Sequence, residues 1–196
     1  MKKFILTITF ILMFFTTSFV SAYAEPSLED AKNIYIDIIN NYKYNKELGE
    51  SAFNSCPDKN IAGMFYHDVT FAYNNKGGAC RQLSSVLIYN FLKSNIGASQ
   101  LILGYNDIEK SHTCVIYKLN GQTYVADPAL QLQLKSENIQ VKINLVNLTL
   151  SNYINFLKSL NCKYETAIVL NCPPPYLNKD INELKDNIDC MVYHLK

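Results

Sequence analysis

Three residues in the middle of the chain, Cys80, His112 and Asp127, could together form a thiol catalytic site. A thiolate attacks carbonyl carbons, an imidazole can take the thiol proton, and a carboxylate beside the imidazole fixes its tautomer and supports its positive charge. Cys80 follows Gly77-Gly78 and begins an apolar-striped stretch that predicts a helix. A cysteine at a helix N-terminus has its thiolate stabilised by the helix dipole. We expect the neighbouring Arg81 to help hold the thiolate or an anionic group of a substrate.

The relation between His112 and Asp127 depends on a predicted β-hairpin. Asn120-Gly121 lies between two strand-like stretches, and this dipeptide is a strong signal for a two-residue hairpin turn. With that turn, the numbers of paired residues add to 241, so Asp127 lies opposite Cys114 and on the same face as His112. Diagonal neighbours of this kind have Cα atoms about 7–8 Å apart, within reach of His and Asp side chains. We therefore predict a His112–Asp127 hydrogen bond.

Each of the three residues also has a simpler interpretation. Cys80 alone would be read as a small buried cysteine or as half of a disulfide. His112 alone would be an ordinary strand histidine, and Asp127-Pro128 a common strand-ending turn. The order of the three residues, with the last two on one face, favours the catalytic interpretation.

The rest of the pattern predicts one α+β domain, with N-terminal helices followed by an antiparallel sheet. Helices are expected over about 27–42, 61–73, 79–94, 151–160 and 178–188, and strands over 101–105, 113–119, 122–126, 139–148, 165–170 and 190–194. Residues 44–60 are expected to form a loop, and three consecutive prolines, 173–175, forbid regular structure there.

The N-terminal segment predicts export. A basic start, an apolar run over residues 4–20 and the small-residue site Ala22-Tyr23-Ala24 are typical of a secretory signal peptide cleaved after Ala24. The alternative is a membrane anchor, but the run is slightly short for spanning a bilayer. We expect residues 1–24 to be the signal peptide, residues 25–196 to be the mature domain, and the protein to be periplasmic or secreted without a stable membrane anchor.

The composition of the mature chain narrows the classes of partner. Cleavage leaves 172 residues, enough for one domain with its own core. Lys2 and Lys3 leave with the leader, so 16 basic residues face 17 acidic ones and the formal net charge is −1. No basic stripe suggests a nucleic-acid partner. No Cys-x-x-Cys pair occurs, so neither a zinc ribbon nor a thioredoxin-type motif is expected. We expect no cofactor and no metal.

Cysteine usage leaves two disulfide hypotheses open. The mature chain has six cysteines: Cys56, Cys80, Cys114, Cys162, Cys172 and Cys190. Export to an oxidising compartment favours disulfides, and the short loop makes Cys162–Cys172 the best structural bridge. In the first hypothesis Cys114 pairs with Cys80 in an oxidised, inactive form. In the second, the other four cysteines form two structural bridges and these two stay reduced.

The quoted motifs resemble a known superfamily. Gly77-Gly78-Ala79-Cys80 before a helix, Ser111-His112-Thr113-Cys114-Val115, and the stretch from Asn120 to Pro128 together resemble the papain-like fold in its transglutaminase-like branch. Residues 124–131 are most similar to the papain-fold glutamine deamidases of bacterial toxins, the dermonecrotoxin-type domains. In these domains a glutamine soon follows the Asp strand, which Gln131 or Gln133 would match. Gly-Gly-x-Cys is also similar to arylamine N-acetyltransferases, whose long N-terminal part this chain lacks. The resemblance covers residues 74 to about 133.

The resemblance implies a secreted thiol enzyme with Cys80, His112 and Asp127 as its catalytic triad. It implies attack on a carboxamide or peptide bond through a thioester, and in particular deamidation of glutamine in a host or competitor protein by a toxin or effector. Transglutaminase-like cross-linking, proteolysis and a catalytically inactive binding domain of the same fold remain alternatives. The family also implies an oxyanion hole made by the Cys80 backbone N–H and an upstream amide side chain, for which Asn74 and Asn75 are candidates.

Overall fold

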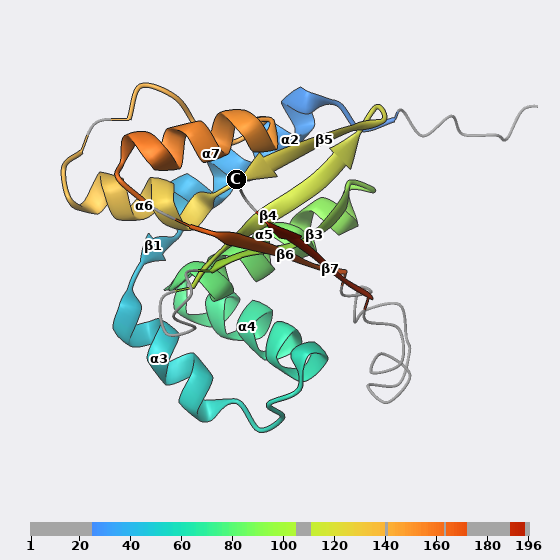
Figure 1. Ribbon diagram of the computed structural model, residues 1–196. Coiled ribbons are helices and arrows are strands. Elements are labelled where there is room, and N and C mark those ends of the chain that lie inside the picture. Colours follow the sequence, from blue (N-terminus) through green and yellow to red (C-terminus); the bar gives the residue numbers. More distant parts are fainter. Residues whose placement is uncertain (1–24, 105–110, 140, 163, 172–188, 195–196) are drawn as a thin grey trace, which may run out of the picture.

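The computed structural model describes residues 25–104, 111–139, 141–162, 164–171 and 189–194 (Figure 1). Within these residues the elements are α2 (Leu28–Asn41), β1 (Lys43–Tyr44), α3 (Lys46–Ser55), α4 (Ile61–Asn75), β2 (Gly77–Gly78), α5 (Cys80–Lys93), β3 (Gly97–Gly104), β4 (His112–Leu119), β5 (Gln122–Ala126), α6 (Pro128–Ser136), α7 (Leu150–Ser159), β6 (Thr166–Asn171) and β7 (Asp189–His194). The predicted signal peptide, the proline run and the predicted helix 178–188 lie outside the described residues.

The central feature is a five-stranded antiparallel sheet with the strand order β5-β4-β3-β6-β7. A separate two-residue pair, β1 and β2, is parallel. Figure 1 shows α7 on one side of the sheet and α4 and α5 on the other. The predicted mixture of helices and an antiparallel sheet is therefore confirmed.

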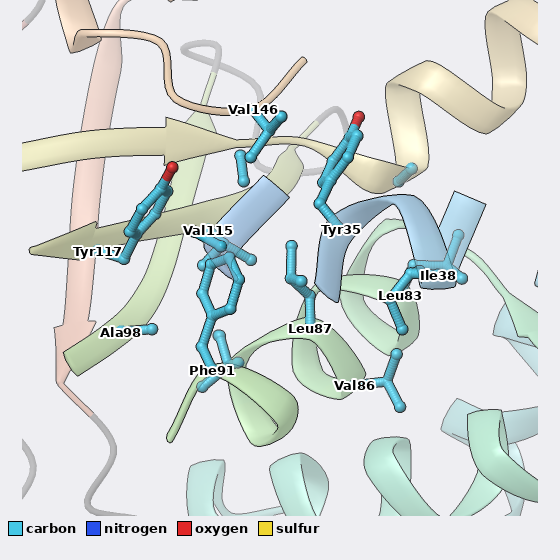
Figure 2. Packing of buried hydrophobic residues seen from close by; sticks show 14 of the residues in the cluster. Tyr35, Ile38, Leu83, Val86, Leu87, Phe91, Ala98, Val115, Tyr117 and Val146 are labelled. Atoms are coloured by element: carbon cyan, nitrogen blue, oxygen red, sulfur yellow. The ribbon is translucent and has the colours of Figure 1, made fainter. Parts of the chain in front are cut away.

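The larger core lies between α5 and the sheet. The apolar stripe of α5 includes Leu83, Leu87 and Phe91, which are fully buried. Figure 2 shows these side chains pointing from α5 toward α2 and toward Val115 of β4. The rings of Phe91 and Tyr117 have centroids 4.8 Å apart. This packing fixes the helix that begins at Cys80 against the strand that begins at His112.

A smaller core covers the opposite face of the sheet. It contains Cys114 of β4 and Val125 of β5, packed with Tyr153 and Leu157 of α7. Because successive residues of a strand face opposite sides, Cys114 belongs to this core while its neighbour Val115 belongs to the larger one. Both faces of β4 are therefore buried, and its first residue, His112, lies at the rim of the sheet.

Several predicted elements have the expected positions. Ser27 caps α2 with a capping box formed with Asp30. The helices predicted at 61–73, 79–94 and 151–160 correspond to α4, α5 and α7, and the strands predicted at 101–105, 165–170 and 190–194 correspond to β3, β6 and β7. Among the described residues, no helix has both the length and the apolar composition needed to cross a bilayer.

The prediction that residues 44–60 form a loop is wrong for most of this range, because it contains α3. The Asn45 side chain accepts a hydrogen bond from the Leu48 backbone N–H at 2.9 Å and so caps this helix. The helix buries only Gly49 and Ala52, two small residues, against the rest of the molecule. A helix that buries so little apolar surface leaves a weak periodic signal in the sequence.

Two further differences follow from the residues after β5. Pro128 is the first residue of α6 and not only a strand stop, because proline suits the first position of a helix. The predicted strand at 139–148 is wrong, since its described residues pair with the sheet only at an isolated bridge between Leu148 and Val125. The Leu145 backbone N–H instead donates to the Gln131 side chain at 2.9 Å.

Candidate active site

A short parallel ladder positions Cys80. Gly78 of β2 pairs with Tyr44 of β1, Ala79 follows as the N-cap, and α5 begins at Cys80. Gly78 has a φ of 157°, and a Cβ added there would lie 2.5 Å from the Cβ of Gln82. Only glycine therefore fits where the chain turns into the helix. The prediction that Cys80 lies at a helix N-terminus is confirmed.

The hairpin positions His112 and Asp127 as predicted. Val115 pairs with Ala126, which is the expected register. Asn120 and Gly121 both have positive φ, as the predicted two-residue turn requires. His112 Nε2 lies 2.7 Å from Asp127 Oδ2, so the predicted hydrogen bond is confirmed.

The Cys80 thiol lies on the other side of the imidazole. It is hydrogen-bonded to the His112 side chain and to the Thr113 backbone. Because Nε2 of His112 already contacts Asp127, the Nδ1 atom is the one that faces the sulfur. The Ser84 hydroxyl donates to the Thr113 carbonyl at 2.9 Å and ties the first turns of α5 to the start of β4.

Electrostatics favour an ion pair between the thiol and the imidazole. Burial by itself would raise the pKa of Cys80, but the hydrogen bond and positive charge of His112 bring that pKa below its ordinary value. Burial by itself would lower the pKa of His112, but the charge and hydrogen bond of Asp127, together with the Cys80 thiolate, raise it well above its ordinary value. A thiolate paired with an imidazolium is the reactive form of a nucleophilic cysteine.

Asp127 is fully buried and receives hydrogen bonds from four elements. Its Oδ2 accepts from His112 and from the Tyr153 hydroxyl of α7, which lies 2.5 Å away. Its Oδ1 accepts from the Leu130 backbone N–H at 3.0 Å and so caps α6. The Tyr35 hydroxyl of α2 donates to the Asp127 carbonyl at 3.1 Å. The carboxylate is therefore held in one orientation toward the imidazole.

Sequence analysis did not identify the aromatic residues around this pair. Tyr153 and Tyr35 have the spacing of ordinary core residues in their helices, and no local pattern indicates a role at the site. The ring of Tyr164 stacks on His112, with centroids 6.3 Å apart and an interplanar angle of 26°. Only the three-dimensional packing brings these tyrosines to the site.

Arg81 forms an ion pair that sequence analysis did not identify. Its Nε and Nη2 atoms lie 2.5 and 3.1 Å from the carboxylate of Asp68, which is fully buried. The Gln82 amide donates to the same carboxylate at 2.6 Å. The guanidinium of Arg81 is therefore paired with Asp68, but Arg81 also lines the cleft that contains Cys80, so its expected contact with the thiolate or an anionic substrate group stays a prediction.

The two candidate oxyanion-hole amides also lie elsewhere. The Asn75 side chain donates to the Phe71 carbonyl of its own helix at 2.9 Å. Asn74 lines a separate cavity of about 370 Å³ together with Tyr66 and Tyr73. Neither residue lines the cleft that contains Cys80, because α4 ends before the chain turns through β2 into α5.

The two glutamines expected after the Asp strand have different surroundings. Gln131 links two segments of the interior, because its side-chain oxygen accepts from the Leu145 backbone N–H at 2.9 Å and from the Tyr35 hydroxyl at 3.4 Å. Gln133 bonds to Glu137 on the exposed side of α6. Gln131 therefore lies next to the contacts that hold Asp127, and Gln133 does not.

The described cysteines with resolved side chains, Cys56, Cys80, Cys114 and Cys162, are free thiols. The predicted bridge from Cys162 to Cys172 stays a prediction, because Cys172 lies outside the described residues. The Cys162 sulfur contacts the Leu160 carbonyl at 3.9 Å. The hypothesis of two structural bridges among the other four cysteines also stays a prediction, since it involves Cys172. Cys114 is hydrogen-bonded to Tyr153, and burial raises the pKa of its thiol. Redox pairing of Cys80 with Cys114 stays a prediction.

A surface cleft of about 500 Å³ gives access to the sulfur. It is lined by Cys80 and Ala79 at the start of α5, by Tyr44 of β1, by Phe53 and other residues of α3, and by Ser111 beside β4. The Cys80 sulfur is thus reachable from outside, whereas Asp127 is buried. Within the described residues, no group of three His, Cys, Asp or Glu side chains is arranged to hold a metal ion.

Comparison with known proteins adds no assignment. No protein-family model matches the chain. No curated protein matches it significantly either.

Proposed function

We propose that the chain is a secreted thiol enzyme of the papain-like, transglutaminase-like class that acts on carboxamides through Cys80, His112 and Asp127. One observation carries the proposal: a cysteine at a helix N-terminus, hydrogen-bonded to an imidazole that is itself bonded to a buried carboxylate, opens onto a surface cleft. Structural cysteines are usually inert and have ordinary or raised pKa values, as Cys114 does. The lowered pKa of Cys80 separates it from that class.

The proposed chemistry proceeds in two halves. The Cys80 thiolate attacks the carboxamide carbon, and the electron pair of the C=O bond moves to oxygen. The backbone N–H of Cys80, at the first position of α5, has no intrahelical acceptor and is free to donate to that oxyanion. As the intermediate collapses, the His112 imidazolium gives its proton to the departing nitrogen, and ammonia leaves. Water, deprotonated by His112, then hydrolyses the thioester to a carboxylic acid and restores the thiol.

The side chain of glutamine in a protein is the proposed substrate. Support comes from the resemblance of residues 124–131 to toxin-type glutamine deamidases and from the place of Gln131 beside Asp127. A host or competitor protein would then be the natural target, in agreement with the predicted signal peptide. Cross-linking and proteolysis differ only in the acceptor or in the bond attacked, because all three reactions share the thioester.

The experiment compares the mature chain, residues 25–196, with its Cys80→Ala variant on casein, a glutamine-rich unfolded protein. Ammonia release, new N-termini and incorporation of monodansylcadaverine are measured in parallel. We expect ammonia release that depends on Cys80, without new N-termini. New N-termini would show that the activity is proteolysis and not deamidation. Incorporation of the amine would show that it is cross-linking.

A second measurement tests the thiol without a natural substrate. Iodoacetamide should alkylate Cys80 at pH 6 faster than it alkylates glutathione, because the lowered pKa of Cys80 leaves a larger fraction of it as thiolate. A rate no higher than that of glutathione, together with no Cys80-dependent reaction on casein, would refute the proposed function.

A further inference from the structure

The strand β1 places one side chain beside the nucleophile. Tyr44 is the Cα partner of Gly78 in the parallel pair, and the Asn45 backbone N–H donates to the Gly78 carbonyl at 2.9 Å. On the other side of Tyr44, the Lys43 backbone N–H donates to the Lys76 carbonyl at 3.0 Å. These bonds hold Tyr44 alongside the segment that leads into Cys80, although 36 positions separate the two residues in the sequence.

The Tyr44 side chain is partly buried and lines the same cleft as Cys80. Its ring packs against the larger core, as Cys80 also does. The more deeply buried tyrosines Tyr35, Tyr117 and Tyr153 each donate their hydroxyl to a protein oxygen. For the Tyr44 hydroxyl, no such partner exists among the described residues. The Tyr44 hydroxyl is therefore free to donate a hydrogen bond to a group bound beside Cys80.

The charge state of Tyr44 suits donation. Burial raises the pKa of Tyr44, and the negative charges of Cys80 and Asp127 raise it further. The phenol is therefore protonated at neutral pH.

Other polar side chains near Cys80 are less suited to this position. The Gln82 amide donates to Asp68, and its oxygen accepts from the Ala79 backbone N–H at 3.1 Å. Asn54 and Ser111 line the cleft but are exposed, and neither side chain has a hydrogen bond to another of the described residues. A donor is most effective when its orientation is set before the reaction begins. Of these groups, Tyr44 is the one that combines packing with a free hydroxyl.

We propose that Tyr44 is a further catalytic residue, whose hydroxyl donates to the oxyanion formed when Cys80 attacks a substrate carbonyl. The inference rests on the proposed function. As the sulfur–carbon bond forms, the carbonyl π pair moves to oxygen, which accepts hydrogen bonds from the Cys80 backbone N–H and from Tyr44. When the C=O bond re-forms, both donors keep their protons, and the leaving group departs with the electron pair of its bond to carbon.

Two probes of Cys80 separate this role from general support of the thiolate. p-Nitrophenyl acetate acylates a thiol through a tetrahedral oxyanion and releases p-nitrophenolate. Iodoacetamide alkylates the same thiol at a saturated carbon, and no oxyanion forms. Tyr44→Phe keeps the packed ring and removes only the oxygen. We expect it to slow acylation about a hundredfold, as removal of one oxyanion donor does, and to leave the alkylation rate unchanged.

The matched control is Tyr66→Phe, which makes the same change at an exposed tyrosine of α4 outside the cleft. It should leave both rates at the wild-type value. Wild-type acylation in Tyr44→Phe, or an equal loss of both reactions, would overturn the role of Tyr44 while leaving the proposed function in place. If wild-type Cys80 is acylated no faster than glutathione, the proposed function fails, and this inference fails with it.

Discussion

Replacing Asp127 by asparagine removes one negative charge from the centre of the site and keeps the cap of α6. Asparagine caps helices as well as aspartate does, so its oxygen can still accept from the Leu130 N–H that begins α6. Its amide nitrogen then faces Nε2 of His112. An amide N–H cannot accept a hydrogen bond, so the neutral imidazole must carry its proton on Nδ1, facing Cys80. That is the wrong tautomer for a base.

The size of the effect follows from the bond that is lost. The His112–Asp127 distance is 2.7 Å, and the aspartate is fully buried. A hydrogen bond to a charged group contributes about 1.5–3 kcal/mol. Since one pKa unit corresponds to about 1.4 kcal/mol, the pKa of His112 should fall by about one to two units. The imidazolium supports the Cys80 thiolate, so the pKa of Cys80 should rise toward its ordinary value.

The assay is the rate of iodoacetamide alkylation at Cys80 as a function of pH, read by peptide mass spectrometry because other free thiols are present. In the wild type, the lowered pKa of Cys80 keeps the rate high below the ordinary thiol pKa, and the rate falls as the pH drops through the lowered value. In Asp127→Asn the midpoint should move to higher pH by about one unit or more.

The control is Asp37→Asn, the same change on the exposed side of α2, which should leave the midpoint in place. An unchanged midpoint in a folded Asp127→Asn protein would refute the chain of charges from Asp127 through His112 to Cys80. A shift to lower pH would refute the sign of the coupling.

Three further changes have definite expected outcomes. Cys80→Ala should abolish ammonia release, and His112→Ala should lower it about as much, because residues that act as one unit lose their effect together. Ammonia release by Cys80→Ala would refute the assignment of the site. Tyr153→Phe removes a competing donor to the buried carboxylate, so the imidazolium is held more tightly and the alkylation midpoint should move to lower pH, opposite to the effect of the asparagine variant. Arg81→Ala leaves buried Asp68 without its cation and should lower the free energy of unfolding, measured in urea, by about 3–5 kcal/mol. A loss below about 1 kcal/mol would show the ion pair to be unimportant for stability.

The sequence predicts the relation of His112 and Asp127 because that relation is local. A two-residue turn and the two-residue period of strands set the register over 15 positions, and both signals are present in Asn120-Gly121 and its flanks. The start of α5 is predictable for a similar reason, because the glycine pair and the apolar stripe are adjacent to Cys80. These local rules place His112 beside Asp127 and Cys80 at a helix start, whereas the expectation that Cys80 meets His112 comes from the resemblance.

The parts that sequence analysis missed depend on contacts between distant segments. Arg81 appears free in sequence, but it is paired with Asp68 from the preceding helix. Tyr44 reaches the cleft through a two-residue parallel pair, which is too short to leave a periodic pattern. Tyr153 reaches Asp127 across the sheet edge from α7. The α6 helix was missed because its first residues, Asp127-Pro128, are equally typical of a turn.

The three hydrogen bonds to the Asp127 carboxylate couple the local stability of α6 to the reactivity of the Cys80 thiolate. One carboxylate is bonded by β4 through His112, by α6 through the Leu130 amide and by α7 through Tyr153. Unfolding of the first turn of α6 exposes that amide to exchange with deuterium and at the same moment frees the carboxylate from its orientation. The exchange rate of the Leu130 amide is therefore a direct measure of how often the imidazole loses its partner. As temperature rises, thiolate reactivity should decline with this local opening, well before the sheet itself unfolds.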